Sequence, residues 1–139
     1  MNVYIAAPFF TEDQLSIVKR IESALEKECI PYFSPRSEGV LKSMNKEDQK
    51  KNKSDIFNSN IRNMDACTHM IACVEYRDTG TSFEIGYAFS SDIPIVLFCE
   101  KIDLINVMLA ESATAICDNV SFIRSSLEGK YTVEVGDLT

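Results

Sequence analysis

The sequence is poor in residues on which many metal and cofactor sites depend. Its 139 residues contain no tryptophan, one histidine, five glycines and five cysteines. The cysteines are far apart and form no CxxC pair, which argues against a structural zinc site and a disulfide framework. The five are Cys29, Cys67, Cys73, Cys99 and Cys117. Four of them lie in or beside apolar segments, and we expect these four to act as small core residues.

Positive charge is also scarce, and long apolar runs are missing. The chain has 21 acidic and 14 basic residues, a formal net charge of -7. This balance argues against affinity for nucleic-acid polymers or anionic membranes, because both require clustered cations. No apolar run approaches the ~20 residues that span a bilayer, and the first ten residues lack the charged start of a secretory signal. We expect a cytoplasmic protein with no membrane association.

What is present is an alternation of strand-length apolar runs with segments of helical period. The length and a hydrophobic content of 45% fit a single domain over residues 1–139. Thr11 and Gln14 form a capping-box pattern at the start of the first helix. In order, we predict a strand over 3–7, a helix that follows Thr11 and ends at Pro31, a strand over 31–35, a loop from Arg36 to Lys53, a helix from Ser54 to Ala66, a strand over 69–75, a helix over 81–91 and a strand over 93–98.

This order predicts an α/β fold of the flavodoxin or Rossmann type. We expect a doubly wound parallel sheet of about five strands with helices on both faces. In such sheets, ligands bind beyond the carboxyl ends of the strands. That rule selects three loops, "APFF" at 7–10, "SPRSEG" at 34–39 and "EYRDTG" at 75–80.

The residue that needs an explanation is Glu84, which lies among apolar and small residues just after the third loop. A buried carboxylate is costly unless it is paired, hydrogen-bonded or chemically used. One interpretation is a carboxylate near a helix N-terminus, where the helix dipole contributes about 0.3–1 kcal/mol. The other is a reactive group at the edge of the sheet.

Three stretches favour the second interpretation. "YIAAPFF" at 4–10, "RDTGTSFEIGYA" at 77–88 and "INVM" at 105–108 resemble the signature regions of the nucleoside 2-deoxyribosyltransferase family. Their order and spacing agree over nearly the whole chain. The central stretch is the most specific, with an Asp six residues before a Glu and a Gly-Tyr-Ala tail.

This resemblance implies transfer of 2-deoxyribose between 2'-deoxynucleosides and free nucleobases by double displacement. Glu84 would be the ionised nucleophile, held by a hydrogen bond from Tyr4. Asp78 would contact the base and manage its proton, and Phe9 would stack on it. Gly80 belongs to the same central motif, and we assign it to substrate binding as well. No metal and no organic cofactor is implied.

The resemblance also implies contacts from elsewhere in the chain and from a second subunit. Asn106 and Met108 would complete a neighbour's site, with Asn106 holding the sugar 5'-hydroxyl. The family implies dimers that assemble into hexamers. Arg36 and Glu38 would select between base edges.

One position departs from the family pattern. Alignment through "MIACV" places Thr68 where the family has an aspartate. A hydroxyl can hydrogen-bond a base but does not ionise as a carboxylate does. Either Asp65 takes over that role or the base is handled differently.

Several alternatives stay open at the level of sequence. Single residues have structural interpretations: core packing for Tyr4 and Phe9, turn formation for Asp78, and a surface ion pair between Arg36 and Glu38. For the whole protein, one alternative is a hydrolase of deoxynucleoside 5'-monophosphates, which would require a phosphate cradle. The other is a non-catalytic nucleotide-binding module, because fold alone does not fix function.

Overall fold

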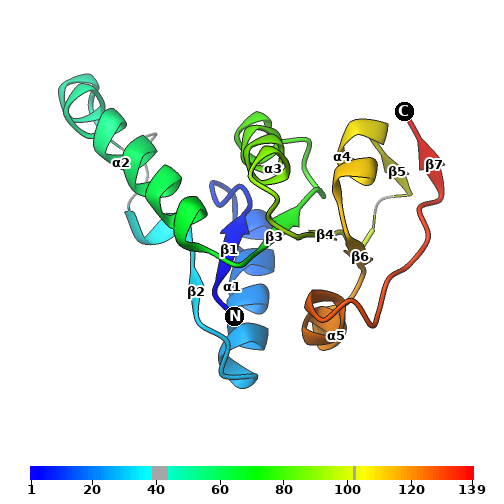
Figure 1. Cartoon of the computed structure of the whole chain (residues 1–139). Coiled ribbons are helices and arrows are strands. Elements are labelled where there is room, and N and C mark those ends of the chain that lie inside the picture. Colours follow the sequence, from blue (N-terminus) through cyan, green and yellow to red (C-terminus); the bar gives the residue numbers. More distant parts are fainter. Residues whose placement is uncertain (39–43, 102) are drawn as a thin grey trace.

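The computed structural model describes residues 1–38, 44–101 and 103–139, and its centre is a parallel sheet. The sheet has five strands in the order β2-β1-β3-β4-β6, every neighbouring pair parallel (Figure 1). The predicted α/β fold is therefore confirmed. The strands are β1 (Val3–Ala6), β2 (Tyr32–Phe33), β3 (His69–Cys73), β4 (Ile95–Phe98) and β6 (Ala115–Cys117).

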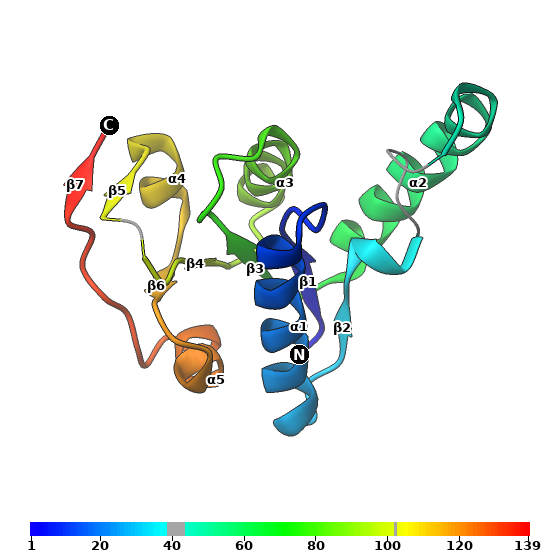
Figure 2. The same cartoon turned by 180° about the vertical axis from the view of Figure 1, so that it is seen from behind.

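Helices cover both faces of this sheet, as predicted. Helices α1 (Glu12–Lys27) and α5 (Ile123–Leu127) pack on one face. On the other face lie α3 (Thr79–Ser90), α4 (Val107–Ser112) and the end of α2 (Lys46–Ala66). Figure 2 shows the two layers from behind. The described residues also form the short 3-10 helices η1 (Pro35–Glu38) and η3 (Val120–Phe122).

Alternation along the strands divides the core between the two faces. Ile5 and Ile71 belong to the cluster under α1, whereas their neighbours Tyr4 and Met70 belong to the cluster under α3. These residues are paired in register, Tyr4 with Met70 and Ile5 with Ile71. Because successive side chains of a strand point to opposite faces, Tyr4 is directed toward α3.

The first helix begins as predicted and ends earlier. Thr11 caps α1, and the capping box with Gln14 is present. The helix stops at Lys27, not at Pro31, because Cys29 adopts a positive φ of 56°. A left-handed residue of this kind terminates a helix.

The predicted loop from Arg36 to Lys53 is wrong over much of its length. Helix α2 begins at Lys46, eight residues before the expected start, and the Asn45 side chain caps it by accepting from the Asp48 N–H. Lys, Glu and Gln are good helix formers, so a polar segment with a cap can be helical. Figures 1 and 2 show this part of α2 extending away from the sheet. Residues 39–43 of the predicted loop lie outside the described residues.

A second, small sheet joins distant parts of the chain. Strands β5 (Leu104–Ile105) and β7 (Asp137–Leu138) pair in parallel. The sequence did not show how the segment from Tyr131 onward would fold. In the part of the chain that is described, none of the helices has both the length and the apolar character to cross a membrane.

The cysteines and the histidine are placed largely as expected. Cys73, Cys99 and Cys117 are buried, Cys67 is partly buried, and all five cysteines are free; Cys29 alone is exposed. The single histidine is the first residue of β3. Among the described residues there is no group of three His, Cys, Asp or Glu side chains arranged to hold a metal ion.

Candidate active site

A hollow of about 420 Å³ lies at the carboxyl edge of the sheet. Its walls come from the ends of β1 and β2, from α2 and from the start of α3. We call it the Glu84 hollow. Four phenylalanines contribute most of its aromatic surface, Phe9, Phe10, Phe57 and Phe83, and three polar side chains face it, Asn60, Asp78 and Glu84.

Glu84 lines this hollow and is hydrogen-bonded to Tyr4, which is buried and does not line it. The Tyr4 hydroxyl donates a hydrogen bond to Glu84 Oε2. Burial raises the pKa of Glu84 to about 7; the nearby Asp78 charge adds to this, and the Tyr4 hydrogen bond opposes it. Burial thus favours the neutral form of this carboxyl group more than water would, whereas the family resemblance implies an ionised nucleophile.

Tyr4 is suited to act as a fixed donor. Its side chain is fully buried on β1. Burial, and then the charge of Glu84, hold the pKa of its phenol far above the ordinary value. Tyr4 therefore keeps its proton at any physiological pH and orients the carboxylate without exchanging a proton with it.

Asp78 has a structural role in addition to its place in the hollow. Its Oδ2 accepts from the Thr81 N–H and the Thr81 hydroxyl, both at 2.9 Å, which caps α3. Gly80 stands beside this carboxylate, and an added Cβ there would lie 3.3 Å from Asp78 Oδ2. Both residues line the Glu84 hollow. Asp78 therefore forms the turn that the structural interpretation predicts. It also lines the hollow, as its proposed role in handling the base requires.

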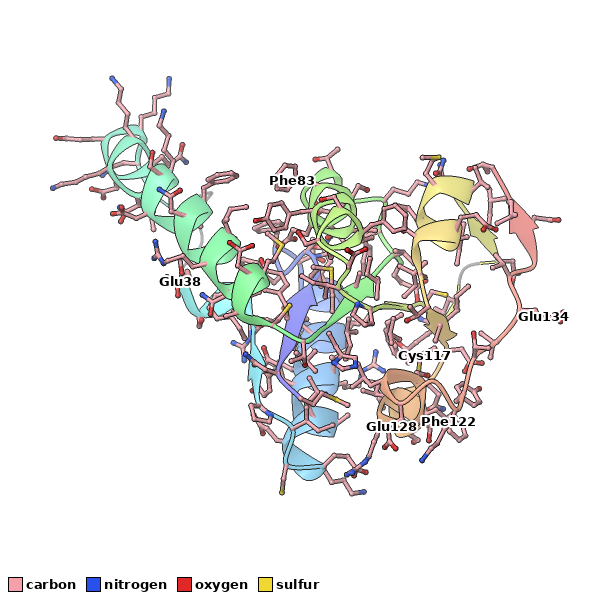
Figure 3. All side chains as sticks on the ribbon, in the orientation of Figure 1. Glu38, Phe83, Cys117, Phe122, Glu128 and Glu134 are labelled. Atoms are coloured by element: carbon pink, nitrogen blue, oxygen red, sulfur yellow. The ribbon has the colours of Figure 1, made fainter. Side chains whose placement is uncertain are left out.

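Aromatic rings form the wall opposite the carboxyl groups. Phe9 and Phe10 lie with ring centroids 4.7 Å apart, and Phe57 and Phe83 with centroids 6.2 Å apart. Figure 3 shows Phe83 on α3. Phe83 is 53% exposed although it is large and apolar. Flat apolar walls of this kind suit a planar ring such as a nucleobase.

Asn60 is the site residue that the sequence reasoning missed. It lies on α2 and lines the hollow, and its buried Oδ1 has no hydrogen-bond partner within the described residues. Most buried polar atoms are paired, so an unpaired one facing a hollow indicates a ligand contact. Helical spacing could have revealed it, because Asn60 lies three residues after Phe57 and four before Met64 on one face.

Thr68 lies at the opposite edge of the sheet, and its proposed contact with a base is not supported. It precedes β3, accepts a hydrogen bond from the Asn2 N–H at 2.8 Å and donates one to the Asn2 carbonyl at 3.1 Å. Asp65 does not replace it, because its Oδ1 accepts from the Tyr87 hydroxyl at 2.6 Å and it is not part of the hollow.

Arg36 and Glu38 are also outside the Glu84 hollow. Arg36 makes a two-pronged ion pair with the buried Glu22 of α1, at 2.8 and 2.6 Å. Neither the base contact nor the pair with Glu38 is therefore observed. Glu38 is exposed on η1, with α2 between it and Phe83 in the view of Figure 3. From that loop it is Pro35 that reaches the hollow.

Asn106 and Met108 line a different hollow. This second space, of about 640 Å³, lies between the loop after β3, β5 and α4, and we call it the α4 hollow. Asn106 caps α4, its Oδ1 accepting from the Met108 N–H at 2.9 Å. Met108 is 75% exposed. Neither residue lines the Glu84 hollow of its own chain, and Asp78 lines both hollows.

Together, the fold and the site define an α/β protein with a buried carboxyl group in an aromatic hollow at the carboxyl edge of its sheet. Comparison with known proteins gives the family. The model of the nucleoside 2-deoxyribosyltransferase family matches residues 3–133, and the chain belongs to this family. No curated protein sequence gave a significant match.

Two solved structures are similar to this one. The 2-deoxyribosyltransferase of Bacillus psychrosaccharolyticus has a TM-score of 0.78 and 26% identity, over 88% of this chain and 90% of that one. A conserved protein from Enterococcus faecalis V583 has a TM-score of 0.61 and 15% identity, over 100% of this chain and 90% of that one, and shares the fold. Family and fold together indicate a transferase of the deoxyribosyltransferase type.

Proposed function

We propose that this protein transfers 2-deoxyribose between nucleobases through a covalent ester on Glu84. The observation that carries the proposal is Glu84, which lines an aromatic hollow and accepts a hydrogen bond from the buried Tyr4 hydroxyl. The similar structure from Bacillus psychrosaccharolyticus is described as a 2-deoxyribosyltransferase used for nucleoside synthesis, which supports the same substrate class here.

The proposed reaction has two displacements at C1' of the sugar. In the first, a Glu84 oxygen bonds to C1' as the bond from C1' to the base nitrogen breaks, and the base leaves with a proton. In the second, a nitrogen of another base bonds to C1', the C1'–Glu84 ester bond breaks to release the carboxylate, and Asp78 accepts the proton of that nitrogen. Charge on the sugar resembles an oxocarbenium ion at each step, which a carboxylate stabilises and then captures, as in retaining glycosidases.

The hollow supplies the other roles. We assign base stacking to Phe9 and base-edge recognition to the unpaired amide of Asn60. Asp78 handles the proton of the leaving base, a form of acid-base assistance typically worth ~10²- to 10⁴-fold in rate. Unlike a carboxylate, an amide both donates and accepts hydrogen bonds. We therefore expect acceptance of bases with either an amino or an oxo group at the edge that meets Asn60.

We also propose that the working enzyme is a homo-oligomer. Asn106 and the exposed Met108 would enter the Glu84 hollow of a second copy of the chain. The Asn106 Oδ1 is already bonded within its cap, which leaves its NH2 group as the donor for the sugar 5'-oxygen. On this basis a single chain would be nearly inactive, and activity would rise with association.

The charge of the site favours transfer over the alternative hydrolysis of 5'-monophosphates. No lysine or arginine is found among the described residues that line the Glu84 hollow. A phosphate dianion would meet two carboxyl groups there, which is unfavourable without cations. Arg77 and Ser82 line the α4 hollow instead.

The decisive experiment is to incubate the protein with thymidine or deoxyinosine, with and without adenine or cytosine, and separate the products. A new deoxynucleoside that forms only with added base establishes transfer. Glu84→Ala should abolish it, and Glu47→Ala, which removes an exposed carboxylate of α2, should not. Release of base without exchange would identify a hydrolase, and ligand binding without turnover would identify a binding module.

A further inference from the structure

Two backbone hydrogen bonds bracket Asn106. The Thr139 N–H donates to the Ile105 carbonyl at 3.1 Å, and the Val107 N–H donates to the Thr139 carbonyl at 2.8 Å. The main chain of residue 139 is therefore hydrogen-bonded to the residues on both sides of Asn106. We call these two hydrogen bonds the Asn106 bracket. Both bonds use main-chain atoms, so they fix the path of the backbone through Asn106 regardless of the side chain at 139.

These two bonds belong to a longer contact between residues 136–139 and residues 103–107. Asp137 donates from its N–H to the Asp103 carbonyl at 2.7 Å, and β7 then runs beside β5. Gly136 permits this approach, because an added Cβ would lie 2.8 Å from the Asp103 carbonyl oxygen. That distance is shorter than ordinary contact, and the opposing atom belongs to backbone, which cannot rotate away as a side chain can. Only glycine fits at this position without moving the segment.

Packing alone would hold the Asn106 region poorly. Val107 is 40% exposed, Met108 is 75% exposed and Leu104 is 38% exposed. Helix α4 has only six residues, and short helices have little stability of their own. Ile105, which is 3% exposed, is the one well-buried anchor among these four. The backbone bonds to residues 137 and 139 are therefore a major constraint on where Asn106 lies.

We infer that residues 136–139 are a positioning element for sugar recognition. They hold the backbone on both sides of Asn106, so that its capped side chain presents the NH2 group in one orientation. This inference rests on the proposed role of Asn106 in binding the 5'-oxygen. Residues 136–139 themselves need not touch the substrate.

A matched pair of variants separates the backbone of residue 139 from its side chain. Thr139→Pro removes the N–H that bonds Ile105, whereas Thr139→Ala keeps both main-chain bonds. Gly136→Ala disturbs the same segment from its other end. Amide hydrogen exchange of Val107 measures whether its bond to the Thr139 carbonyl is intact, and this measurement does not depend on enzyme activity. We expect faster exchange in Thr139→Pro and Gly136→Ala, and wild-type exchange in Thr139→Ala.

The catalytic readout is the ratio of kcat/KM for a 2'-deoxynucleoside to that for its 2',5'-dideoxy analogue. One hydrogen bond to the 5'-oxygen should give the wild type a ratio of about 3 to 10. The ratio should fall toward one in Thr139→Pro and Gly136→Ala, as in Asn106→Ala, and stay unchanged in Thr139→Ala. General destabilisation would lower both rates together and leave the ratio unchanged.

Each contrary result has a separate meaning. A Val107 amide that exchanges freely in the wild type overturns the bracket itself. Faster exchange in Thr139→Pro with an unchanged substrate ratio overturns the positioning role. If Asn106→Ala keeps the wild-type ratio, the role of Asn106 is wrong and the inference falls with it. Absence of all transfer in the wild type refutes the proposed function, and the exchange result then still decides whether the bracket exists.

Discussion

Replacing Glu84 with glutamine should stabilise the protein at high pH while destroying its activity. The folded-state pKa of Glu84 is about 7, above the ordinary value of 4.5. As pH rises, the unfolded chain therefore loses this proton before the folded protein does. Ionisation favours the unfolded chain, so the stability penalty starts to grow near pH 4.5 and levels off above pH 7. Glutamine has nearly the same size and no titration, so it removes the penalty.

The size of the effect follows from the shift. Moving the pKa from 4.5 to about 7 corresponds to a limit of about 3 kcal/mol. By linkage, the cost is about 1 kcal/mol at pH 5 and about 3 kcal/mol at pH 8. The free-energy gain of Glu84→Gln should therefore be about 2 kcal/mol larger at pH 8 than at pH 5.

The assay is denaturant unfolding of wild type and Glu84→Gln at several pH values, at one protein concentration because association would also change stability. Glu47→Gln serves as the control, since it removes one exposed negative charge outside the hollow. A gain from Glu84→Gln that is the same at pH 5 and pH 8 would refute the raised pKa. A gain that becomes smaller as pH rises would show that folding lowers the pKa of Glu84 and does not raise it.

Three further predictions concern the same region. Tyr4→Phe removes the bond that lowers the Glu84 pKa, so the rise of kcat/KM with pH should move to higher pH and kcat should fall about 10-fold or more; an unchanged pH profile would contradict this. Asn60→Ala should raise KM for acceptor bases about 10-fold with little change in unfolding temperature, because its Oδ1 has no partner among the described residues to lose; steady-state kinetics with purine and pyrimidine acceptors would test it. Arg36→Ala leaves Glu22 buried without its partner and should cost about 1–3 kcal/mol of stability, less than for a fully buried pair because Arg36 is partly exposed. The Arg36→Ala variant should keep the wild-type preference among bases. A changed preference would show that Arg36 contacts the base after all.

Prediction from sequence succeeded where the signal was local. The Thr11–Gln14 capping box, the alternation of strands and helices, and the parallel sheet all follow from periodicity and caps. Prediction failed over 46–53, where polar residues suggested a loop and a capped helix formed. Hydrophilicity reports exposure, and an exposed segment can still be helical when its residues favour helix.

Prediction of the site residues also succeeded for some residues and failed for others. The strand-end rule and the family motif placed Tyr4, Phe9, Asp78 and Glu84 at one edge. In the structure Phe9, Asp78 and Glu84 line the Glu84 hollow, and the buried Tyr4 hydroxyl donates to Glu84. Thr68 was selected by aligning "MIACV" with the family pattern, yet it lies at the amino end of that strand, where it pairs with Asn2. Distance along the sequence does not tell which end of a strand a residue meets.

The sequence by itself predicted the order of the strands and helices, the parallel sheet covered on both faces, and Glu84 as the carboxyl group of the candidate site. Only the tertiary structure decided that Arg36 is committed to Glu22, that Asn60 lines the hollow and has a buried oxygen without a partner, and that residues 136–139 hydrogen-bond on both sides of Asn106. The physical reason is that these three facts depend on contacts between segments distant in sequence. Side-chain partners and close backbone approaches are set by packing in three dimensions, which periodicity and local propensity do not encode.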